Sequence, residues 1–266
     1  MNNHLAMIRN IRVAGSAKLG MLCIAAAAIA ACSTEEAPGP LEPTGPVGRV
    51  RLVNLITDAN RQVVNASLEG LVFTVNLGYG GAAPANLPAP STANYAPVYS
   101  GSRTFVLKRT ADTTVTVATL PVTIADNQDR TVYAIGGAGG STVTAFATTD
   151  DNPAAAAGET RLRIVNMSPT AGAVDVFVTA VNADLSTATA RASGLAYQGA
   201  SAYFTVAPGT YQIRAVPAGT AAANRAASVT INLASTAFAS ATGRTIVLAD
   251  NSTGGAPLRA IVIADR

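Results

Sequence analysis

The residues that most often carry catalysis and metal binding are scarce in this chain and lie near its N-terminus. The 266 residues include one histidine, His4, and two cysteines, Cys23 and Cys32, and no tryptophan. A Ser-His-Asp or Cys-His catalytic group, or an imidazole or thiolate metal site, is therefore excluded for everything after residue 32. An enzyme built from that part would have to use carboxylates, tyrosines, arginines or Lys108, its only lysine. We therefore expect a protein that is not an enzyme and that holds no metal or cofactor.

Cys32 stands at the end of a segment typical of exported proteins. Residues 1–18 are basic, and an apolar run follows from Leu19 to Ala31, which is the pattern of a signal peptide. The run is shorter than the roughly 20 residues that a membrane-spanning helix requires. Ile29-Ala-Ala-Cys32 is similar to the lipobox of bacterial lipoproteins, which implies cleavage after Ala31 and acylation of Cys32. The alternative is an ordinary signal peptide, cleaved near Ala30, with Cys32 incidental.

Removal of residues 1–31 changes what the charge of the chain implies. These residues contain three of the 18 Lys and Arg and no acidic residue, so the remainder holds 15 basic and 15 acidic side chains. A neutral chain without a basic patch is not expected to bind nucleic acid. Residues 32–48 contain four prolines and should form an extended, disordered tether. Acyl chains on Cys32 would make a membrane the partner, and Ser33 resembles the pattern of lipoproteins sent to the outer membrane.

Tyrosines on either side of a long loop are the best candidates for ligand binding. Tyr79, Tyr95 and Tyr99 flank residues 80–94, and Tyr197 and Tyr203 occupy similar places later in the chain. Aromatic side chains on loops can stack on sugars or hold peptides, so this segment predicts a binding site for a glycan or a peptide. The alternative is that these rings pack in a core, because aromatics repeated in two similar domains usually mark repeated packing.

Acidic and glycine-rich segments give weaker signals for chemistry. Asp126-Asn-Gln-Asp129 and Asp150-Asp-Asn152 could offer oxygens to Ca²⁺, but neither has the length or the final glutamate of a calcium loop, so we interpret both as turns. Asp175 lies between valines and is expected to be a strand residue that bonds a neighbouring loop or arginine. Gly136-Gly-Ala-Gly-Gly140 lacks the Lys-Ser/Thr of a phosphate loop and predicts a hairpin.

The elements that must position these residues occur in two copies. Arg49-Val-Arg-Leu-Val-Asn-Leu55 matches Arg161-Leu-Arg-Ile-Val-Asn-Met167 almost residue for residue, and the closing segments that end at Asp150 and Asp265 also correspond. Within each copy, apolar residues alternate with polar ones and Val, Ile, Thr and Tyr dominate, which indicates strands. The second copy holds about seven such runs in roughly 105 residues without a convincing helix.

We therefore predict an all-β protein with two tandem immunoglobulin-like antiparallel β-sandwiches after the signal peptide and tether. A small closed barrel is the alternative fold for each copy. The expected organisation is a signal peptide over 1–31, the acylated cysteine and tether over 32–48, and the first sandwich over 49–150. A linker over 151–160 and the second sandwich over 161–266 complete it.

The motifs of the second copy resemble a bacterial extracytoplasmic family, domain of unknown function 4397. The resemblance rests on Arg161-Leu-Arg-Ile-Val-Asn-Met-Ser-Pro-Thr-Ala171, on Ala173-Val-Asp-Val-Phe-Val178 and on Ala207-Pro-Gly-Thr-Tyr211. It covers residues 158–266 and, less closely, residues 48–150. It implies an immunoglobulin-like sandwich, often in tandem and often on lipoproteins, with no established activity. In the first copy, Thr57-Asp58 replaces Ser-Pro and Val64 stands where Asp175 would be.

These observations favour a non-catalytic, lipid-anchored protein of the cell envelope that acts as an interaction, adhesion or structural module. The first alternative is a module that binds a glycan or peptide through the Tyr-rich loop of the first copy. The second alternative is a hydrolase that works with two carboxylates, which would need both groups to meet in one cleft.

Overall fold

A computed structural model describes residues 45–85 and 94–266 of the chain. Cys32, the predicted signal peptide and most of the predicted tether lie outside the described residues, as does the middle of the loop between Tyr79 and Tyr95. The described part is almost entirely β-structure, with three short 3-10 turns at Ala138–Gly140, Ala222–Asn224 and Ala226–Ser228. None of its helical segments is long and apolar enough to cross a membrane.

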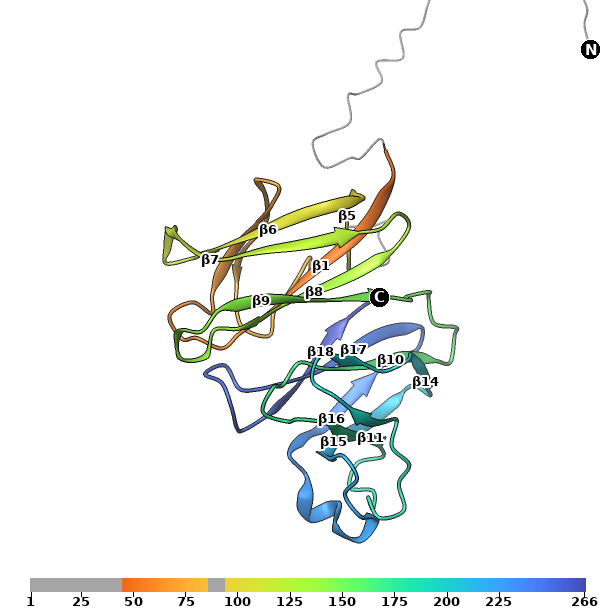
Figure 1. Ribbon diagram of the computed structural model, residues 1–266. Helices are drawn as coiled ribbons and strands as arrows, with labels where there is room; N and C mark the ends of the chain where they lie inside the picture. The colour runs from red at the N-terminus through yellow and green to blue at the C-terminus, as the bar shows by residue number, and fades with distance from the viewer. Residues whose placement is uncertain (1–44, 86–93) are drawn as a thin grey trace, which may run out of the picture. The chain divides into compact units, whose positions relative to one another are not determined.

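The first repeat is a sandwich of two sheets (Figure 1). One sheet has the strand order β4-β1-β8-β9, with β5 also paired to β1, and the other has the order β3-β2-β6-β7. The strands are β1 (Val47–Ile56), β2 (Val64–Leu68), β3 (Leu71–Leu77), β4 (Ala82–Ala83), β5 (Ala96–Tyr99), β6 (Gly101–Arg109), β7 (Asp112–Ile124), β8 (Asp129–Gly136) and β9 (Val143–Asp150). The predicted hairpin over the glycine-rich segment is confirmed, because β8 and β9 are antiparallel neighbours on either side of it.

The second repeat has the same topology. Its sheets have the orders β13-β10-β17-β18, with β14 also paired to β10, and β12-β11-β15-β16. The strands are β10 (Thr160–Asn166), β11 (Val174–Thr179), β12 (Ala192–Leu195), β13 (Gly199–Ala200), β14 (Phe204–Val206), β15 (Gly209–Pro217), β16 (Ile231–Phe238), β17 (Thr242–Ala249) and β18 (Arg259–Ala264). The predicted pair of sandwiches is confirmed, but β12 was not among the runs that the sequence predicted.

One pairing in each repeat differs from the antiparallel arrangement that the sequence predicts. β1 runs parallel to β8 over eight residue pairs, and β10 runs parallel to β17 over seven. The two members of each pair are separated in the sequence by the strands of the opposite sheet, so a parallel partner is reached without a hairpin. Each first strand is therefore central in its sheet and has neighbours on both edges.

The first strands are buried on both faces, which explains their nearly continuous apolar sequence. Val50, Leu52 and Ile56 point into the core of the first sandwich, with Phe105 and Leu107 from β6. Val53 and Leu55, on the opposite face of β1, belong to a different apolar cluster.

That second cluster joins the two repeats. Its buried members come from β1 and β8 of the first repeat and from the region of β10, β17 and β18 of the second: Val53, Leu55, Tyr133, Ile135, Val165, Met167, Val247, Ala249 and Ile263. The outer face of the β1 sheet therefore packs on the outer face of the β10 sheet, and the described repeats bury apolar surface against each other. We call this contact the inter-repeat contact.

A buried asparagine lies near the end of each first strand. Asn54 donates from Nδ2 to the carbonyls of Gln62 and Leu77 at 2.7 and 2.8 Å, and its Oδ1 accepts the Ile56 amide. Asn166 makes the same pattern in the second repeat, and both side chains are fully buried. The asparagine of the repeated motif thus fixes the loop that follows the strand.

Gly48 tests how tightly the start of β1 is packed. A Cβ at this position would lie 2.3 Å from the carbonyl oxygen of Ala125 and 2.6 Å from Cγ2 of Ile124. Because a backbone carbonyl cannot move aside easily, we expect Gly48→Ala to lower the free energy of unfolding by about 1–3 kcal/mol. Urea unfolding followed by far-ultraviolet circular dichroism measures this change.

Gly78→Ala is the matched control for Gly48→Ala. A Cβ at Gly78 meets no atom within 4 Å, so its effect should stay within about 0.5 kcal/mol. Equal stability of the two variants would contradict the close approach at residue 48.

Candidate functional site

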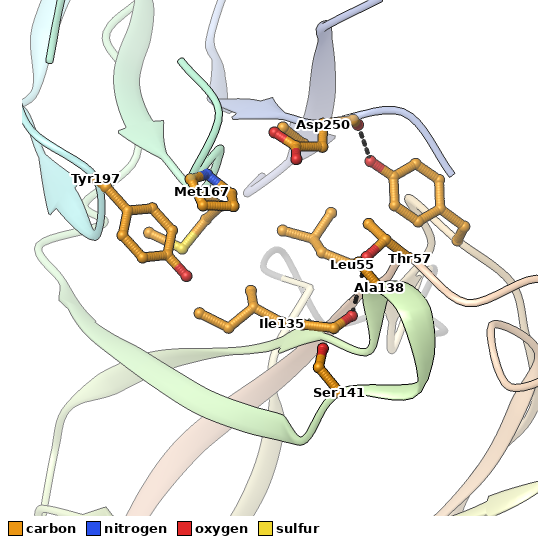
Figure 2. Close-up of a pocket in the computed structure, with 12 residues that line it drawn as sticks. Leu55, Thr57, Ile135, Ala138, Ser141, Met167, Tyr197 and Asp250 are labelled. Atoms are coloured by element: carbon orange, nitrogen blue, oxygen red, sulfur yellow. Dashed lines mark hydrogen bonds between the residues drawn. The ribbon is translucent and has the colours of Figure 1, made fainter. Parts of the chain in front are cut away.

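A pocket of about 150 Å³ opens where the inter-repeat contact ends (Figure 2). It is lined from both repeats by Leu55, Thr57, Tyr79, Ile135, Gly136, Ala138, Ser141, Met167, Pro169, Tyr197, Ala249 and Asp250. In Figure 2, Tyr197 and Met167 lie across one space from Ile135 and Ser141. The deepest lining is apolar and buried, whereas Ala138, Ser141, Pro169 and Tyr197 are exposed and form the rim.

Equivalent positions of the two repeats meet in this pocket. Leu55 and Met167 end matching strands, Ile135 and Ala249 lie at the same place in β8 and β17, and Tyr79 corresponds to Tyr197. The β8–β9 hairpin supplies Gly136, Ala138 and Ser141. The pocket therefore depends on both repeats being present and in contact.

Tyr79, one of the predicted binding residues, lies in the wall of this pocket. Its hydroxyl donates a hydrogen bond to the backbone carbonyl of Asp250. Burial raises the pKa of Tyr79 to about 12, so the hydroxyl remains a donor at neutral pH. The Tyr79 ring is partly buried, and its hydroxyl is bound to Asp250 of the second repeat.

Asp250 is a structural carboxylate. Its two oxygens accept hydrogen bonds from the hydroxyls of Ser168 and Thr170 and from the amide of Gly255 at 2.8 Å. A carboxylate with this many internal donors is already solvated by the protein. It holds the loop before β18 and does not present a bare charge to the pocket.

Tyr197 differs from its counterpart in the first repeat. Its side chain is 37% exposed, and its hydroxyl makes no hydrogen bond to another described residue. The ring forms an open aromatic wall on the rim of the pocket. Tyr197 occupies the place of Tyr79 in the second repeat, but it was not a predicted binding residue, because the long loop that indicated a site belongs to the first repeat.

Four charged side chains cross the inter-repeat contact. Arg51 donates to the carboxylate of Asp265 at 2.8 Å, and Arg163 pairs with Asp150 at 2.6 Å. Each arginine thus bonds the aspartate of the other repeat, and all four side chains are at most 3% exposed. Asp150 and Asp265 also accept from the hydroxyls of Thr131 and Thr245, respectively. We call these four residues the crossed ion pairs.

Tyr95 packs against the crossed ion pairs and not on an open surface. It is 1% exposed, its hydroxyl donates to Asp150 at 2.8 Å, and the guanidinium of Arg51 lies 4.5 Å from its ring centre. Burial raises its pKa far above the usual range. Tyr203 lies under Arg163 in the same way, at 4.8 Å. The structure therefore places Tyr95 in the interior, as the alternative of core packing expects, and not on an open surface.

Tyr99 is the third predicted binding residue and lies away from the pocket. It ends β5, where it pairs with Val47 at the beginning of β1, and it is 42% exposed. The pocket lies at the other end of β1, where Leu55 and Thr57 line it. Of the three tyrosines, only Tyr79 contributes to the pocket.

The acidic candidates serve as structural groups. Asp175 accepts from the amides of Gly194 and Gly219, as the prediction of a bond to a neighbouring loop requires. Strand registers place Asn65, not Val64, at the corresponding position, and Asn65 accepts from Asn76 and Thr110 in the same manner. Asn65 therefore bonds its neighbouring segments in the first repeat as Asp175 does in the second. No group of three or more His, Cys, Asp or Glu that could hold a metal occurs among the described residues.

Comparison with known proteins gives one family match. Residues 48–177 match the family described as DUF4397, a domain of unknown function. The match covers the first repeat and continues to Phe177 in β11, although the sequence motifs resemble the family more closely in the second repeat. No curated protein matches the chain.

Similarity to solved structures is low. A leucine-rich repeat protein from Bacteroides thetaiotaomicron is 12% identical with a TM-score of 0.18, and the match covers 76% of this chain and 26% of that one. A family 41 carbohydrate-binding module from streptococcal virulence factors, described for α-glucan recognition, is 11% identical with a TM-score of 0.26 over 83% and 98% of the chains. A family 26 module of Eubacterium rectale Amy13K, solved with maltoheptaose, is 7% identical with a TM-score of 0.22 over 82% and 95%.

The chain spans about a quarter of the length of the leucine-rich repeat protein, and TM-scores this low carry no argument about the ligand. The family match and the immunoglobulin-like arrangement of the strands agree with each other. This all-β chain therefore carries a DUF4397-like domain.

Proposed function

We propose that this protein is a non-catalytic, lipid-anchored module of the cell envelope whose two repeats act together as one rigid unit in holding a partner. The observation that carries this proposal is the use of the buried charged residues. Arg51, Asp150, Arg163 and Asp265 all serve to join the repeats. A joined pair presents loops from both repeats in a fixed geometry, which suits recognition.

The anchor is supported by the sequence around Cys32 and by the place where the fold begins. β1 starts at Val47, only 15 residues after Cys32, and the intervening segment is rich in proline. Acylation at Cys32 would therefore hold the rigid unit close to a membrane through a short tether. The outer membrane is the destination that Ser33 favours.

Substitution of Cys32 tests the anchor. We expect wild-type protein in the membrane fraction and Cys32→Ala protein outside it, because a single residue carries the acyl chains. Globomycin, which blocks cleavage of lipoprotein precursors, should make the uncleaved form accumulate. Cys23→Ala, in the predicted signal peptide, is the control and should remain membrane-bound. Unchanged membrane association of Cys32→Ala protein would refute the anchor.

Chemical crosslinking in intact envelopes tests the interaction role. We expect discrete crosslinked species that contain the wild-type protein and that diminish for the Cys32→Ala form, because the anchor keeps the module beside its partner. Only the uncrosslinked monomer in both strains would contradict the proposal.

Ligand binding by the Tyr-rich segment, residues 77–99, is the second candidate function. One observation favours it: Tyr79 lines the pocket together with Tyr197. Tyr95 is buried against Arg51 and Asp150, so a ligand would meet Tyr79 and Tyr197 and not the segment as a whole. A glycan or a peptide could both use an aromatic wall, and the chemistry of the lining separates them.

A further inference from the structure

We propose that the pocket between the repeats binds a single apolar side chain, aromatic or aliphatic, from a partner polypeptide. The proposal rests on the interaction role proposed above and names the class of ligand. An anchor side chain buried in such a pocket is the usual centre of a protein–protein contact, with weaker contacts around it.

The size of the pocket fits one side chain. Its volume is about 150 Å³, and a dry cavity of about that size holds a benzene ring. Sites for larger small molecules usually have volumes of about 300–1,000 Å³. The pocket is therefore too small for an extended ligand to lie inside it, and it suits one group that projects from a chain.

The floor of the pocket is apolar. Leu55, Ile135, Met167 and Ala249 are all buried, and they are members of the apolar cluster that joins the repeats. The flexible thioether of Met167 can adapt to side chains of different shape. An apolar group placed against this floor is removed from water on several sides.

The polar groups of the wall favour an apolar ligand over a sugar. The Thr57 hydroxyl donates to the carbonyl of Gly136 at 3.1 Å, and the Tyr79 hydroxyl donates to that of Asp250. The Asp250 carboxylate is fully engaged by its own loop and the loop after β10. Among the side chains of the described lining residues, only the hydroxyls of Ser141 and Tyr197 on the rim make no hydrogen bond within the protein. A sugar ring would lose most of its hydrogen bonds with water and regain few.

The mouth of the pocket lies at the end of β1 opposite Val47. The rim residues come from both repeats, so an anchored partner would contact both. β1 begins at Val47, whereas the pocket is lined by Leu55 and Thr57 at the other end of this ten-residue strand. At about 3.3 Å per residue, the two ends are roughly 30 Å apart.

Met167 provides a direct probe of the pocket. The four methionines are Met1, Met7, Met21 and Met167, so only Met167 follows the predicted cleavage site. The intact protein, in lipid nanodiscs and labelled with ¹³C at the methionine methyl groups, is titrated with N-acetyl-phenylalaninamide, N-acetyl-leucinamide and methyl glucoside. Met167→Leu identifies the signal.

The expected result is a saturable shift of the Met167 methyl signal with both amides, at millimolar concentration because one side chain buries little area. The phenyl probe should shift it more, through its ring current. Tyr197→Ala should weaken binding by about fivefold or more. Tyr99→Ala, which changes an equally exposed tyrosine outside the pocket, should leave the affinity unchanged. Circular dichroism confirms that both variants are folded.

Three outcomes would overturn the proposal. A response to methyl glucoside without a response to the amides would make this a sugar site. Equal amide affinity in the Tyr197→Ala and wild-type proteins would place the binding elsewhere, and no saturable response at all would remove the site. Crosslinking in intact envelopes would still decide the proposed interaction role, so failure of the two proposals can be distinguished.

Discussion

Arg51→Leu is expected to lower the free energy of unfolding by about 3–5 kcal/mol, because it breaks a buried ion pair from one side. The substitution removes a fully buried guanidinium that bonds Asp265 and the carbonyl of Ala264 from the other repeat. It also leaves the Asp265 carboxylate buried without its cation. Removing one member of a buried pair lowers the stability by more than the pair itself contributes, because the remaining charge is left buried without a partner or water.

A double-mutant cycle isolates the pairing itself. With Arg51→Leu and Asp265→Asn, we expect a coupling energy of about 1.5–3 kcal/mol. Urea unfolding is followed by circular dichroism, since the chain has no tryptophan to report by fluorescence.

The Arg49–Asp129 pair is the matched control for this cycle. Arg49 is two residues from Arg51 on the same strand, and it pairs with Asp129 at 2.6 Å, but its side chain is 39% exposed. Its coupling should be about 0.2–1 kcal/mol, because water screens the exposed guanidinium. Equal coupling in the two cycles would mean that Arg51 and Asp265 do not meet in a buried contact.

Asn166→Ala is expected to lower the free energy of unfolding by about 3–5 kcal/mol, and Asn54→Ala by a similar amount. Each substitution leaves one buried carbonyl and one buried amide without a partner and also removes a bond to a partly buried carbonyl. Each unsatisfied buried group costs about 1–3 kcal/mol. The equality of the two effects follows from the identical bonding pattern in the two repeats.

Asn232→Ala serves as the control for the asparagine variants. Asn232 is exposed and accepts one hydrogen bond from Gln212, so its loss should cost less than about 1 kcal/mol. A similarly small cost for Asn166→Ala would show that water reaches the loop after β10.

Much of the fold follows from the alternation of side chains along the strands. The runs around Val50 and Leu162 predicted the first strand of each repeat, and Gly136–Gly140 predicted a hairpin. The parallel partners of these strands could not be predicted in the same way, because a strand's pattern states which faces are buried but not which neighbour lies at its edge. β12 was missed because Ala192–Leu195 has little apolar alternation.

The crossed ion pairs and the pocket were harder to predict, although the sequence contains two signals for the ion pairs. Arginines at positions 51 and 163, and aspartates at 150 and 265, occur at matching places in both copies of a chain that is poor in charge. A charged residue kept in a buried strand implies a buried partner. The sequence could not show that the partners are exchanged between copies, or that Tyr95 is buried while Tyr197 is exposed.

The crossed ion pairs have the form of a twofold-symmetric dimer interface contained within one polypeptide. Residue and partner change places between the two halves, as they do when two identical subunits meet. Nine residues between Asp150 and Thr160 connect the two repeats. Because the connection is covalent, the two halves meet in an intramolecular step, and a short flexible connection gives each half a local concentration in the millimolar range around the other. The contact is therefore formed at any dilution, and a protein present at only a few copies per cell would keep its shared pocket intact.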